Sequence, residues 1–119
     1  MQFFYDAVLP QSLSAESPPG VIFHRWDGSD ISDKELVRES AKRGCRGVIF
    51  WGRDSLQQAD LRNTAQETGV ALVAVEADSP VSAKHRILKN LSGLQLKLND
   101  HNCLLILANE VRPVDNNNS

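Results

Sequence analysis

The sequence predicts an α/β fold, a three-layer sandwich in which helices cover both faces of a central, mostly parallel sheet of about five strands. Short apolar runs rich in β-branched and aromatic residues alternate with polar segments long enough to form helices. Helix-length segments between strands act as crossovers, which make neighbouring strands parallel. The chain has 119 residues, 41% of them hydrophobic. This is enough for one core, so residues 1–114 are expected to form a single domain, followed by a disordered polar tail at 115–119.

The first strand is expected at residues 2–5, which are mostly aromatic. A short helix at 9–16 should follow and stop before Pro18-Pro19-Gly20, because proline cannot continue a helix. Residues 21–25 are again β-branched and aromatic, and Asp27-Gly28-Ser29-Asp30 is a turn cluster. The chain therefore begins as strand, helix, strand and turn.

The next helix is predicted to begin after Ser32. Ser32 with Glu35 three residues later matches the capping-box pattern, and Gly44 is a natural end for the helix. Residues 47–51 form a nearly continuous apolar run bounded by glycines. Such a run is typical of a strand that is buried on both faces.

The second half of the chain repeats this alternation. It is expected to contain, in order, a helix at 55–68, a strand at 70–75, a helix from 79 to 98 that breaks near Ser92-Gly93, and a strand at 103–107 that residues 111–114 extend. Gly69 provides the stop between the first two of these elements.

Three aspartates, Asp6, Asp33 and Asp54, are expected at one edge of this sheet. Asp6 and Asp54 follow the predicted strands at 2–5 and 47–51, and Asp33 begins a helix near the same edge. Clustered carboxylates repel one another and are tolerated mainly where a cation neutralises them, so the pattern indicates a divalent-metal site. Ordinary roles stay open: Asp33 as a helix-start acid, Asp54 as a helix cap and Asp6 as a turn residue.

Composition limits the other functions. The net charge of −2 argues against a strongly electrostatic grip on nucleic acid, so any such contact must be local. Basic residues gather in two places, at Lys42-Arg43 with Arg46 and Arg53, and at Lys84-His85-Arg86 with Lys89, where a solvated helix face is the simpler interpretation.

The two cysteines, Cys45 and Cys103, are widely separated, which predicts free buried thiols rather than a zinc site or a disulfide. The sequence shows neither a leader pattern nor an apolar stretch of membrane-spanning length. We therefore expect a cytoplasmic protein without a membrane partner.

Three segments carry a family resemblance. Residues 3–10 read Phe-Phe-Tyr-Asp-Ala-Val-Leu-Pro, residues 31–36 read Ile-Ser-Asp-Lys-Glu-Leu, and residues 47–54 read Gly-Val-Ile-Phe-Trp-Gly-Arg-Asp. Their order resembles that of the small PIN-like domains related to toxin ribonucleases. In that family a strand ends Asp-Glu-Asn-Leu-Pro, a helix opens Ser-Asp-Glu-Glu, and a strand ends Thr-Arg-Asp-x-Asp. The resemblance covers about the first half of the chain in detail.

The resemblance implies a metal-dependent endoribonuclease of PIN-like fold. Asp6, Asp33 and Asp54 match the carboxylates that hold Mg²⁺ or Mn²⁺ in the family, and Glu35 is a candidate for the acid or base that orients water. RNA is the implied substrate, and the protein would be the toxin of a toxin-antitoxin pair with a DNA-binding antitoxin as partner. A homodimer is a further expectation.

Two alternatives stay open. Ala7-Val8 stands where the family has Glu-Asn, and Ser55-Leu56-Gln57 stands where a second aspartate is common, which is consistent with a catalytically degenerate PIN-like interaction domain. The other alternative is a receiver-like signalling domain, which also places acids after its first and third strands and a basic residue before a late proline, here Arg112-Pro113. Receivers, however, carry a pair of acids at the first strand and a longer first helix.

Overall fold

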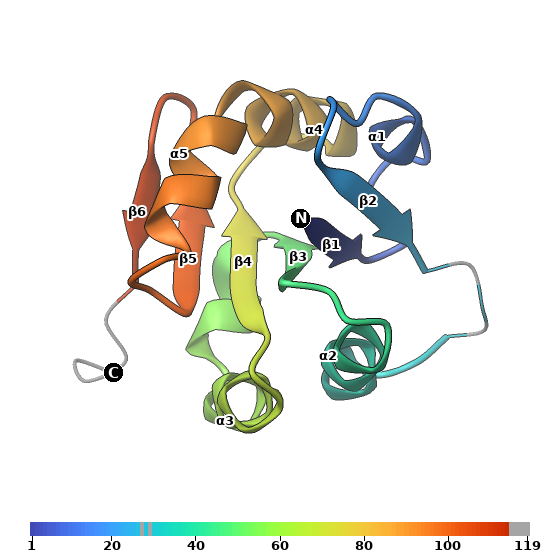
Figure 1. The fold of residues 1–119 in the computed structure, drawn as a ribbon, viewed down its shortest axis with the longest axis vertical. Coiled ribbons are helices and arrows are strands. Elements are labelled where there is room, and N and C mark those ends of the chain that lie inside the picture. The colour runs from blue at the N-terminus through green and yellow to red at the C-terminus, as the bar shows by residue number, and fades with distance from the viewer. Residues whose placement is uncertain (27, 29, 115–119) are drawn as a thin grey trace.

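The computed structural model describes residues 1–26, 28 and 30–114. It shows an α/β protein built on a six-stranded sheet with the strand order β2-β1-β3-β4-β5-β6 (Figure 1). All neighbouring strands are parallel except β6, which is antiparallel to β5. The prediction of an α/β sandwich with a mostly parallel sheet is confirmed. The predicted tail at 115–119, and positions 27 and 29 of the predicted turn, lie outside the described residues.

The elements alternate along the chain as the hydrophobic pattern predicts. The strands are β1 (Gln2–Tyr5), β2 (Ile22–Arg25), β3 (Gly47–Trp51), β4 (Ala71–Val75), β5 (Cys103–Ile106) and β6 (Val111–Pro113). The helices are α1 (Ser12–Ala15), α2 (Asp33–Lys42), the 3₁₀ turn η1 (Arg53–Gln57), α3 (Ala59–Thr68), α4 (Pro80–Lys89) and α5 (Leu91–Lys97).

Two hydrophobic cores lie on the two faces of the sheet. Helices α1, α4 and α5 pack on one face against side chains such as Phe3, Ile49 and Val73. Helices α2 and α3 pack on the other face against Phe4, Leu72 and their neighbours. Figure 1 shows the sheet between these two helical layers. Consecutive strand residues point to opposite faces, so the central strands must be apolar throughout, and all five residues of β4 are buried.

Several boundaries differ from the sequence prediction for local reasons. The predicted helix at 55–68 divides into η1 and α3 because Gln58 is in an extended conformation. The late helix breaks at Asn90 rather than at Ser92-Gly93, and the Asn90 side-chain amide donates to the carbonyls of Arg86 and Leu107. The predicted extension of the last strand instead turns back as β6, closed by a hydrogen bond from Leu107 N to Glu110 O of 2.9 Å.

The strand order creates a topological switch point at the carboxyl edge of the sheet. After β1 the chain passes through α1 on one face, whereas after β3 it passes through α3 on the other face. Because β1 and β3 are neighbours, the segments that follow them diverge to opposite sides of the sheet. Ligands of open α/β sheets bind at such a switch point. Within the described part of the chain, no helix is long and apolar enough to span a bilayer.

Candidate functional site

The segment that follows β1 places Asp6 at the switch point. The Asp6 backbone N donates to Ile49 O of β3 at 3.4 Å, which ties the start of this segment to the neighbouring strand. Asp6 also closes a tight turn, because its backbone oxygen accepts from Leu9 N at 3.0 Å and its side-chain Oδ1 accepts from Val8 N at 3.4 Å. The carboxylate is partly buried.

Arg25, at the end of β2, braces the same segment. Its Nη2 donates to Ala7 O at 2.9 Å and its Nε to Leu9 O at 3.5 Å. The two strands are in register at this point, with Tyr5 paired to Arg25. This role of Arg25 was not predicted from the sequence, where its one signal is a charged residue at the end of a predicted strand.

Asp33 reaches the site from α2, of which it is the first residue. The preceding Ser32 is in an extended conformation and its Oγ accepts a hydrogen bond from Glu35 N at 3.2 Å, which confirms the predicted helix start. Partial burial of the Asp33 carboxyl raises its pKa, and the negative charge of Asp6 raises this pKa further. The structure therefore brings Asp6 and Asp33 within electrostatic reach of each other.

The two carboxylates lack a positive partner in the described residues. No lysine, arginine or histidine forms an ion pair with either Asp6 or Asp33 there, although six ion pairs form elsewhere. Burial and the negative charge of Asp6 act in the same direction on Asp33, since both disfavour the charged form of its carboxyl.

The other two predicted site residues lie differently. Asp54 is exposed in η1, beyond the end of β3, and Glu35 is exposed and ion-paired with Arg38 on the surface of α2. Among residues 1–26, 28 and 30–114, no group of three or more His, Cys, Asp or Glu side chains is arranged to hold a metal ion. The structure thus brings together two of the three predicted aspartates.

A polar cavity of about 350 Å³ adjoins this edge of β2. Its described lining consists of Gln11, Ser14, Phe23, His24, Arg25 and Arg43. Arg25 therefore contacts both this cavity and the segment that follows Asp6.

Asp6 and Asp33 are the predicted site residues whose carboxylates could contribute ligands to a hard divalent cation. Mg²⁺ is commonly held by only one or two protein carboxylates, with waters and substrate phosphates completing its octahedral shell. Asp6 and Asp33 are partly buried, interact electrostatically and have no ion-pair partner among the described residues, so they are the carboxylates that such a cation would use. Oxygen ligands without cysteine or histidine also favour Mg²⁺ or Mn²⁺ over zinc.

Comparison of this chain with models of protein families, with curated proteins and with solved structures gave no significant match.

Proposed function

We propose that this protein is a metal-dependent ribonuclease of the PIN-like type, in which Asp6 and Asp33 hold Mg²⁺ or Mn²⁺. The observation that carries the proposal is the pair of carboxylates at the β1–β3 switch point, where the charge of Asp6 raises the pKa of Asp33 and no described cationic side chain neutralises either group. The PIN-like resemblance of the first half of the sequence supplies the substrate class, RNA, and the expected antitoxin partner.

Each side chain has a defined task in this proposal. A cation bound by the two carboxylates would activate water and offset the charge that develops on a phosphodiester. Arg25 would bind the phosphate, because a guanidinium has five N–H donors and two of them bond carbonyls of the segment after β1 in the part of the chain that the structure describes. Asp54 and Glu35 are exposed near the start of η1 and of α2, and remain candidates for contacts made through water.

The proposal is tested by cleavage of a single-stranded oligoribonucleotide in the presence of Mn²⁺. Asp6→Asn keeps the size of the side chain but removes the charge that the cation needs, so we expect cleavage to be lost and the thermal stabilisation by Mn²⁺ to fall. Asp100→Asn is the matched control, because Asp100 is exposed before β5 and therefore at the opposite edge of the sheet. Wild-type protein that neither cleaves RNA nor gains stability from Mn²⁺ would overturn the proposal.

A second candidate is a PIN-like interaction domain without catalytic activity. The observation that favours it is Val8, which stands where the family has a polar residue and is 46% exposed in the segment after Asp6. An exposed apolar side chain at the mouth of a site suits contact with a protein surface better than contact with RNA. Loss of partner binding in Val8→Asp, together with an absence of Mn²⁺-dependent cleavage in the wild type, would support this candidate.

A further inference from the structure

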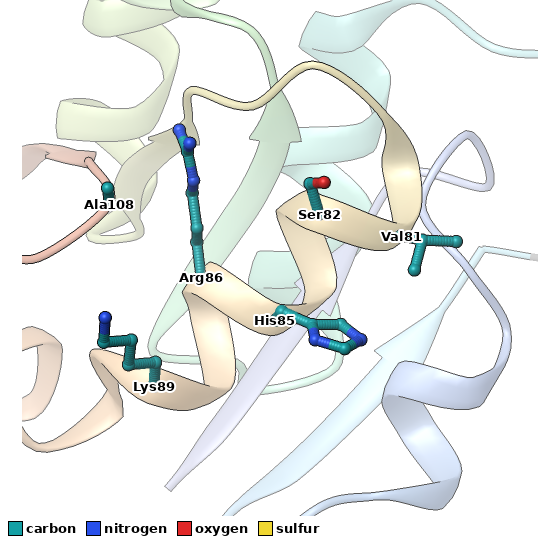
Figure 2. A pocket seen from close by; sticks show the side chains of 6 residues that line it. All are labelled: Val81, Ser82, His85, Arg86, Lys89 and Ala108. Carbon is teal, nitrogen blue, oxygen red and sulfur yellow. The ribbon is translucent and has the colours of Figure 1, made fainter.

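A second cavity lies on the outer surface of α4. Its volume is about 340 Å³, and it is lined by Val81, Ser82, His85, Arg86, Lys89 and Ala108. Figure 2 shows Lys89 extending from α4 toward the segment that carries Ala108, and Arg86 extending toward the segment between β4 and α4. His85 and Val81 lie on the other flank of the helix. The cavity therefore spans α4 and the turn between β5 and β6.

The charged groups of this cavity are all basic. The hydrogen-bond partners of Arg86 and Lys89 are neutral: Arg86 Nη1 donates to the backbone oxygen of Glu76, and Lys89 Nζ donates to Asn109 Oδ1 at 2.6 Å. Among the residues that the structure describes, no carboxylate forms an ion pair with Arg86, Lys89 or His85. In a chain of net charge −2, this is a local concentration of positive charge without internal compensation.

The cavity opens at the same edge of the sheet as the carboxylate pair. Glu76 directly follows β4, and Ala108 lies just after β5, so both mark carboxyl ends of parallel strands. Strand β4 is two positions from β1 in the sheet, which corresponds to roughly 10 Å. Between them, Arg53 pairs with Glu76 at 2.6 Å and neutralises the acid that an approaching anion would otherwise meet.

We propose that the α4 cavity binds a backbone phosphate of the single-stranded RNA, at a nucleotide removed from the one that lies over Asp6 and Asp33. The inference rests on the proposed function for the identity of the polymer. Lys89 and Arg86 supply the charge, and the N–H groups of Arg86 that do not bond Glu76 are available to phosphate oxygens. His85 lines the same cavity, and its ring offers a further N–H donor. In this proposal the basic segment at residues 84–89, for which the sequence alone favours a solvated helix face, contacts the RNA substrate.

The test measures RNA binding without catalysis. A fluorescent single-stranded oligoribonucleotide is titrated in EDTA at several salt concentrations, with the wild type, Asp6→Asn, and the double variant His85→Gln with Lys89→Gln. Both substituted residues of the double variant are exposed, so folding is expected to persist. We expect Kd to rise about tenfold in the double variant, and the slope of log K against log salt to fall by about 0.7 for each phosphate that the variant no longer neutralises.

The controls separate this inference from the proposed nuclease. Lys42→Gln removes an exposed lysine from α2, on the opposite face of the sheet, and should leave Kd and the salt slope unchanged. Asp6→Asn should bind RNA like the wild type in EDTA even though it does not cleave. Retention of cleavage together with an unchanged Kd and salt slope in the double variant would overturn the α4 site while leaving the nuclease standing.

Inorganic phosphate and small nucleotides such as AMP carry the same phosphate group as RNA, so they are the alternative ligands of the α4 cavity. Inorganic phosphate and AMP are therefore added to ¹⁵N-labelled protein, and the backbone amides of residues 81–89 are followed by NMR. The RNA assignment is supported if the oligonucleotide changes these amide chemical shifts at concentrations far below those that phosphate or AMP requires. Saturation by AMP with no response to the oligonucleotide would contradict it.

Discussion

At the scale of single residues, the energetics of Asp33 dominate the candidate site. Burial raises the pKa of its carboxyl first, and the charge of Asp6 raises this pKa further. A group whose pKa is raised by folding binds its proton more tightly in the native state than in the unfolded chain. Its contribution to stability is therefore present at acidic pH and is lost as the pH rises through the pKa of the native state.

Removing the charge of Asp6 should shift this balance. In Asp6→Asn the pKa of Asp33 should fall, yet stay above its ordinary value because burial, the larger cause, is unchanged. The metal-free variant should be more stable than the wild type near neutral pH, and this difference should vanish in acid, where the carboxylates are protonated. Carboxyl-carbon NMR titration gives the pKa, and urea unfolding at the two pH values gives the stability. An Asp33 pKa that does not respond to the substitution would mean that the two carboxylates are not coupled.

At the scale of elements, the start of α2 determines where Asp33 sits. Ser32 is the residue before the helix, and its hydroxyl oxygen satisfies the otherwise unpaired Glu35 N. The other side of the site depends on the segment after β1, which Arg25 holds by two hydrogen bonds to carbonyls. Two separate elements thus position the two carboxylates.

The contribution of the helix cap can be measured directly. Ser32→Ala removes the acceptor for Glu35 N, and we expect it to reduce the free energy of unfolding by about 1 kcal/mol. Ser92→Ala is the control, since Ser92 is an exposed serine within α5 for which no cap role exists, and it should change stability little. Chemical denaturation followed by circular dichroism gives both values. Equal effects of the two substitutions would show that the cap contributes nothing.

At the scale of the whole molecule, the sheet links two separate cores. β4 lies between β3 and β5, and its residues alternate between the core under α1, α4 and α5 and the core under α2 and α3. Because each core packs against the same strands, loss of packing on one face weakens the support for the other. The candidate sites lie at the carboxyl edge of this sheet, so their positions depend on both cores.

Deleting side-chain volume from β4 should therefore destabilise the whole fold. Leu72 is fully buried, and Leu72→Ala should cost about 2–5 kcal/mol through reduced burial and the cavity left behind. Leu96 is 68% exposed on α5, so Leu96→Ala, the same chemical change, should have little effect. Urea unfolding measured by tryptophan fluorescence and by circular dichroism gives the comparison. A Leu72→Ala protein as stable as the wild type would contradict the assignment of β4 to the centre of the core.

The sequence by itself determined the fold class, because hydrophobic period and turn chemistry are local properties. The apolar run at 47–51 and the capping pair Ser32 and Glu35 each predicted an element that the structure contains. The sequence also identified Asp6 as a residue that follows a strand and Asp33 as a residue that begins a helix. These features depend on neighbours within a few positions along the chain.

Only the tertiary structure decided which of these residues meet. The pairing of Asp6 with Asp33, the outward position of Asp54, and the joining of Arg25 to the Asp6 segment depend on the order in which strands associate. The cavity on α4 likewise requires the turn after β5 to lie beside a helix that is distant in sequence. Contacts of this kind are set by the burial of two faces of one sheet, and no local pattern encodes them.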